Sequence, residues 1–199
     1  MKKTLVSAIL GLAAIASVQA QGVVTLYNYG VSHINYGVVN AGGAIGTGIV
    51  DPDTVSGNWN VGLYYALAST TSASAANAAM TGDGGFGLIP LLTLGTGVAV
   101  LNGTPGEFGP LSSGAMTGVA GGANATVVIV AWQGAGNYNA ASVRGHSAAF
   151  TIQAVVAPST PNDVGPLMGS FNVYAVPEPS TFALAGLGLA GLLIFRRRN

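Results

Sequence analysis

Apolar and polar residues alternate repeatedly between residues 21 and 175, and this pattern predicts β-strands. Successive side chains of a strand point to opposite faces, so every second residue shares a face. Residues 126–133 are apolar on both sets of positions, which predicts a strand buried on both faces. Alternation within 59–67 and 150–156 predicts two further strands, with these residues on one face of each: Trp59, Val61, Leu63, Tyr65 and Leu67 in the first, and Phe150, Ile152, Ala154 and Val156 in the second.

Weaker alternation predicts several more strands, and turn-forming Gly, Pro and Asp residues separate most of them. We therefore expect a single all-β, sandwich-like domain over residues 21–175. Residues 69–80 are rich in alanine and are the one stretch of this body that could form a helix, or equally a loop. The weaker strands are expected at 23–28, 34–39, 88–93, 97–101 and 167–174.

The first twenty residues have the pattern of a signal peptide. Lys2 and Lys3 precede an apolar run over 4–18, which ends in the small or apolar positions accepted by signal peptidase. We expect a signal helix over 1–20 and cleavage between Ala20 and Gln21. The alternative is an uncleaved membrane anchor or a buried helix.

The C-terminal segment, 176–199, combines a proline-containing motif, an apolar run and a basic end. Pro177 and Pro179 hold the chain extended before the apolar run of 182–195. As a helix, that run would be about 21 Å long. The hydrocarbon core of a bilayer is about 30 Å thick and usually takes roughly 20 residues, so the run is short for a membrane span. We expect a hydrophobic helix that anchors the chain transiently in the inner membrane, with Arg196, Arg197 and Arg198 as a cytoplasmic stop.

This tail resembles the PEP-CTERM protein-sorting signal, on Val176-Pro177-Glu178-Pro179, the apolar run and the arginine cluster. The resemblance implies recognition of Val176, Pro177, Glu178 and Pro179 by exosortase, a membrane transpeptidase. It also implies sorting to the surface or to the extracellular polymer matrix of bacteria that make exopolysaccharide. The same tail is sometimes labelled an ice-binding protein C-terminal domain, but this label is no evidence that the chain binds ice. Residues 21–24, 61–65 and 131–133, followed by Asn137-Tyr138 and Phe150, resemble uncharacterised exported PEP-CTERM proteins.

Charge and cysteine content exclude several classes of function. Between Gln21 and Val176 the body has one basic residue, Arg144, and five acidic residues, for a net charge of −4 with histidine neutral. A nucleic-acid-binding module needs a basic patch, so that class is excluded. The chain has no cysteine, which removes disulfides and thiolate chemistry.

Three short motifs resemble chemical sites but lack the surrounding pattern. Residues 82–87 match GxGxxG, yet Pro90 follows where a helix is required, so we interpret them as glycine turns. His146-Ser147 sits in an incomplete nucleophile elbow and is interpreted as a polar strand start. Asp51-Pro52-Asp53 is interpreted as a turn, with a weak calcium site involving Asp83 or Asp163 as the alternative. We expect no catalytic residues, metal or cofactor.

Aromatic residues offer one further binding hypothesis. Trp59 and Trp132 lie in strong strands and are expected in the core, whereas Tyr64 and Tyr138 are candidates for exposed rings that stack on sugars. The sequence favours a structural or adhesive matrix protein. The alternatives are a carbohydrate-binding module of the exopolysaccharide matrix and a small secreted hydrolase, which would need His146 and an acid to converge in a pocket.

Overall fold

A computed structural model describes residues 21–39, 45–50, 59–96, 99–100, 106–109, 112–134, 136–156 and 159–176. The described body is mostly β-sheet, as the alternation predicts. Its strands are β1 (Gly22–Leu26), β2 (Ile34–Val39), β3 (Ile45–Val50), β4 (Trp59–Leu67), β5 (Thr93–Leu94), β6 (Ala99–Val100), β7 (Ser112–Met116), β8 (Asn124–Gln133), β9 (Val143–His146), β10 (Phe150–Gln153) and β11 (Phe171–Ala175). Its helical segments are α2 (Ala73–Met80), the 3₁₀ turn η2 (Tyr138–Ala140) and α3 (Gly165–Met168).

Most strands form one large sheet around β4 and β8. These two strands pair antiparallel along their length, from Trp59 opposite Gln133 to Leu67 opposite Ala125. The order β3-β2-β11-β9-β8-β4-β5 runs across the sheet, with β10 also on β8 and β6 also on β4. A second sheet joins β1 and β7 antiparallel. The last strand, β11, lies inside the large sheet, antiparallel to β9 and parallel to β2.

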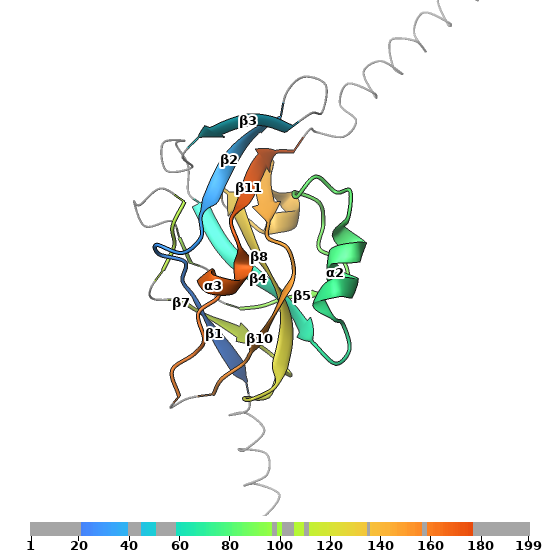
Figure 1. The fold of residues 1–199 in the computed structure, drawn as a ribbon, viewed down its shortest axis with the longest axis vertical. Coiled ribbons are helices and arrows are strands. Elements are labelled where there is room, and N and C mark those ends of the chain that lie inside the picture. The colour runs from blue at the N-terminus through green and yellow to red at the C-terminus, as the bar shows by residue number, and fades with distance from the viewer. Residues whose placement is uncertain are drawn as a thin grey trace, which may run out of the picture.

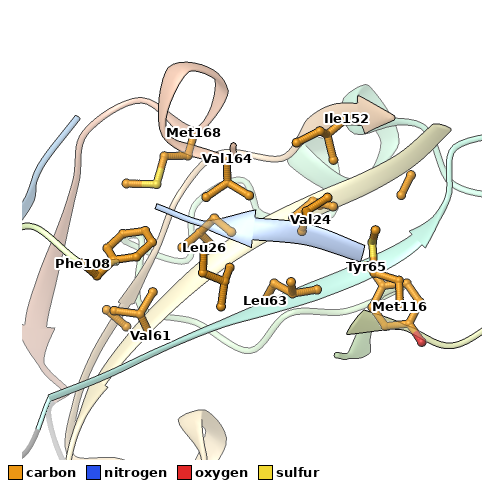
Figure 2. Packing of buried hydrophobic residues seen from close by; sticks show 14 of the residues in the cluster. Val24, Leu26, Val61, Leu63, Tyr65, Phe108, Met116, Ile152, Val164 and Met168 are labelled. Atoms are coloured by element: carbon orange, nitrogen blue, oxygen red, sulfur yellow. The ribbon is translucent and has the colours of Figure 1, made fainter. Parts of the chain in front are cut away.

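The larger hydrophobic core lies between the large sheet and β1–β7. Val24 and Leu26 of β1 are fully buried and belong to the same cluster as Val61 and Leu63 of β4. Figure 2 shows β1 with Val61 and Leu63 on one side and Val164 on the other. The inward residues of β1 therefore join the two sheets through apolar burial, the main stabilising contribution to such a core.

The opposite face of the large sheet carries a second core beneath α2. This cluster contains Val128, Val130 and Trp132 of β8 together with Ala76 and Met80 of α2. The alternate residues of β8 lie in the first core, so β8 is buried on both faces, as its sequence predicts. The side chain of Ser72 caps α2 by accepting a hydrogen bond from the N–H of Ala75 (3.2 Å), the usual role of serine at this position.

The sequence predictions fail where strands are short or rich in small residues. Residues 88–93 were predicted as a strand but are turn and loop up to β5, because Pro90 has no backbone N–H to donate and Leu91 has a positive φ of 66°, which interrupts an extended strand. The pattern did not predict β3, β7 or β9, whose glycine and serine residues break the apolar alternation. The interpretation of His146-Ser147 as a strand start is also wrong, since His146 ends β9 and Ser147 lies before β10.

The chain enters and leaves the body at opposite ends. Gln21 lies beside the start of β1, and Val176 follows the end of β11 (Figure 1). Among the described residues, no helix is long and apolar enough to cross a membrane. The predicted helices over 1–20 and 182–195 lie outside the described residues, as does Ala20.

Candidate functional site

The junction between body and tail is held by the sheet. Tyr174 and Ala175 pair with Arg144 and Val143 of β9, and the N–H of Val176 donates to the carbonyl of Ser142 at 2.7 Å. The backbone is thus fixed in the sheet up to the first residue of the predicted motif. Pro177, Glu178, Pro179 and Arg196–Arg198 lie outside the described residues.

Tyr64 and Tyr138, predicted as exposed stacking rings, are buried in the second core, so that prediction is wrong. Tyr64 is 6% exposed and Tyr138 fully buried, with their rings edge to face at 6.1 Å. The Tyr138 hydroxyl donates to the carbonyl of Gly87 (2.9 Å), and the Tyr64 hydroxyl donates to Oδ1 of Asn139 (3.3 Å). Two segments cover this face of the sheet: the loop that follows α2, and η2. The alternation within a single strand does not reveal such a covering. The core prediction for Trp59 and Trp132 is confirmed.

Burial of these tyrosines predicts a loss of stability in alkali. Burial raises the pKa of Tyr138, and burial likewise raises the pKa of Tyr64. A raised folded-state pKa gives stability that is complete below the unfolded value, about 10, and is lost as the pH rises above it. Residues 21–176 contain no lysine, so tyrosines dominate this range. For Tyr138 alone we expect a loss of about 1.4 kcal/mol per pH unit above that value.

Urea unfolding of residues 21–176 between pH 9 and 11 would measure this effect. Tyr138→Phe removes the ionisable hydroxyl while keeping the ring, and should flatten the pH dependence. Equal slopes for the wild type and Tyr138→Phe would contradict this origin of the alkaline instability.

His146 and Asp83 meet although they are far apart in sequence. Nε2 of His146 lies 2.8 Å from Oδ2 of Asp83, and Nδ1 lies 2.9 Å from the carbonyl oxygen of Ser147. A carbonyl oxygen only accepts, so Nδ1 carries a hydrogen. The N–H of His146 also donates to the carbonyl of Gly85 (2.9 Å), whose own N–H donates to Oδ1 of Asp83 (2.7 Å). The pair therefore fixes the 82–87 turn against β9.

Arg144 strengthens the same attachment. Its Nε donates to the carbonyl of Phe86 (2.8 Å), and its Nη1 donates to the carbonyls of Tyr138 and Asn139. The guanidinium carbon also lies 5.4 Å from the centre of the Tyr138 ring, a cation–π distance. The sole basic residue of the body is thus committed to holding loops together. Residues 82–87 form turns rather than a phosphate-binding loop before a helix, as interpreted from the sequence.

Ser147 is engaged in the same way. It is fully buried, and its Oγ accepts from the N–H of Ile129 (3.0 Å) and donates to the carbonyl of Ala148 (2.8 Å). Within the described ranges no three His, Asp or Glu residues are grouped to hold a metal ion. Asp51 and Asp53 lie outside those ranges. The backbone of Asp163 forms an isolated parallel β-bridge with Thr25 of β1.

A second polar cluster, around Glu107, was not predicted from the sequence. Oε1 of Glu107 accepts from the N–H of Gly30 (2.9 Å) and lies 3.4 Å from Nε2 of His33, while Oε2 is buried without a hydrogen-bond partner. The buried side chain of Asn28 braces the same loop by donating to the carbonyls of Ser32 (2.8 Å) and Gly106 (3.1 Å). Only the polar Tyr27–Tyr29 stretch directly after a strand hinted at this site.

Together these features define an all-β body whose last strand, β11, ends directly before the predicted C-terminal motif. The family model of the PEP-CTERM protein-sorting motif matches residues 175–198. The chain therefore carries a PEP-CTERM sorting motif, and this motif indicates export, processing by exosortase and sorting to the cell surface. No curated protein and no solved structure matches the chain.

Proposed function

We propose that this protein has a structural or adhesive role, without catalysis, at the cell surface or in the extracellular polymer matrix. The sorting motif at 175–198 is the observation that supports this role, because it indicates sorting to the cell surface. Signal peptidase would release Gln21 as the new N-terminus, and that residue is exposed beside β1. The hydrophobic helix would hold the chain in the inner membrane until exosortase acts.

The polar residues of the body also favour a non-catalytic role. His146 and Asp83 converge as a hydrolase would require, but both ring nitrogens of His146 already face protein oxygens. Ser147 has its hydroxyl bonded on both sides within the core. An open groove of about 450 Å³ lies elsewhere, and none of its lining residues carries a charge at neutral pH: Tyr65, Ala66, Leu67, Thr93, Thr117, Gly118 and Val119.

Complementation with Asp83→Asn separates adhesion from catalysis. Asparagine preserves an acceptor for the Gly85 N–H and keeps a polar amide beside Nε2 of His146, so the 82–87 turn should persist. It removes the carboxylate that an acid–base pair would need, a change that typically costs 10²–10⁴-fold in rate. Cells that lack the protein should lose aggregation and matrix retention, and Asp83→Asn should restore both to wild-type levels.

The contrary result is a folded Asp83→Asn protein, present at the surface in normal amount, that fails to restore aggregation. That outcome would favour the hydrolase alternative. An unchanged phenotype on loss of the protein itself would refute the adhesive role. Circular dichroism of the variant checks its fold independently.

A further inference from the structure

Two tyrosines after β1 form an aromatic surface that the sequence analysis did not single out. Tyr29 is 52% exposed, and its ring lies nearly parallel to that of Tyr27, with an interplanar angle of 20° and centroids 6.4 Å apart. The loop that carries them runs from β1 to β2 on the side of the body away from α2 (Figure 1). The exposed ring of Tyr29, backed by the nearly parallel ring of Tyr27, therefore presents an apolar platform.

The platform is held rigid from below. A Cβ atom at Gly109 would lie 2.5 Å from Cδ2 of Tyr27, and Gly109 has a φ of +125°, so only glycine allows this close approach. The carbonyl of Tyr27 accepts from the N–H of Gly165 (2.9 Å). Oδ1 of Asn28 accepts from the N–H of Phe108 (2.7 Å), which completes the set of bonds made by this amide. Such preorganisation reduces the entropy lost when a ligand binds.

Polar groups lie beside the rings. The Glu107 side chain is 5% exposed and bonds the N–H of Gly30, the residue after Tyr29, while its Oε2 is buried without a partner. A buried unsatisfied acceptor costs about 1–3 kcal/mol and calls for an explanation. The His33 side chain, half-exposed and 3.4 Å from Oε1, adds a donor or acceptor at the rim. Glu107 therefore acts from beneath the surface, where it holds the N–H of Gly30, and His33 is the polar side chain that a ligand can reach.

We propose that Tyr27, Tyr29, His33 and Glu107 form a binding site for an uncharged polysaccharide of the matrix. Flat aromatic rings suit the C–H faces of pyranose rings, and the adjoining polar groups suit their hydroxyls. Anionic polymers are disfavoured, because the body has a net charge of −4 and the site itself contains a carboxylate. This inference rests on the proposed function and names the ligand class through which the protein would adhere.

Polymer capture by the full-length chain tests the site. The chain, purified in nonionic detergent and immobilised on beads through an epitope tag, is incubated with fluorescent dextran, galactomannan or hydroxyethyl cellulose, and with alginate as the anionic comparison. At least one neutral polymer should be retained in preference to alginate. Retention should fall roughly tenfold in Tyr29→Ala, in keeping with the stacking contribution of one ring. Tyr29→Phe should keep most of it, and Thr160→Ala, an exposed residue of another loop, should match the wild type.

Capture of none of the neutral polymers, preference for alginate, or equal capture by Tyr29→Ala would overturn this site. Thermal melting guards against misfolding, and Tyr29→Ala should melt close to the wild type because the ring is exposed. Testing Tyr29→Ala in the aggregation assay distinguishes the two proposals. Normal aggregation with Tyr29→Ala refutes the site alone, whereas normal aggregation without the protein refutes the adhesive role.

Discussion

Gly145→Ala is expected to destabilise the body by about 3 kcal/mol, the upper end of the usual cost of overpacking. Gly145 lies in β9, between β8 and β11. A Cβ atom there would lie 2.1 Å from the carbonyl oxygen of Asn172 and 2.7 Å from Cα of Val173. Both atoms belong to the β11 backbone, so a side-chain rotation cannot relieve the clash. The strand that leads into the sorting segment would be forced out of the sheet.

Urea unfolding of residues 21–176 would measure this loss. Thr151→Ala, an exposed position in β10, is the matched control and should change stability by less than about 0.5 kcal/mol. A second readout is hydrogen exchange of β11, whose amides should lose protection in Gly145→Ala. A stability within 1 kcal/mol of the wild type would show that β9 and β11 are not packed as closely as described.

The strands that the sequence predicts best are those with strong tertiary burial on both sides. β8 has Val, Ile, Ala and Trp on both sets of positions, and each set enters a different core. β4 carries its apolar set into the first core, and α2 forms where the alanine-rich stretch has a serine cap. Local pattern and tertiary environment agree in these elements, so the pattern alone was sufficient.

The polar sites could not be predicted, because each depends on contacts between distant segments. His146 meets Asp83 across 63 residues, and Glu107 bonds Gly30 across 77. Tyr64 was misjudged because the groups that bury it, Tyr138 and the loop after α2, come from other segments of the chain. The periodicity within one strand carries no information about contacts between segments that are distant in sequence. The sorting motif was predictable because its residues are contiguous and act through their order.

Replacing Pro177, Glu178 and Pro179 with alanine is expected to stop sorting almost completely. The three residues lie within the matched range 175–198. Proline interrupts a helix and lacks a backbone donor, so its loss would let the following apolar helix extend toward Ala175 and hide the backbone from exosortase. The body should still fold, because β11 ends before the substitutions. The full-length chain should therefore remain in the inner membrane.

Fractionation of cells that produce the tagged triple variant tests the central claim, that the C-terminal motif sorts this protein to the cell surface. Cells producing Ser159→Ala/Thr160→Ala, at two exposed positions, serve as the control and should release the processed chain like the wild type. The triple variant is expected to accumulate in the inner-membrane fraction at its unprocessed mass, with little at the surface. Arrival of the triple variant at the surface or in the medium, at the wild-type mass and level, would contradict it.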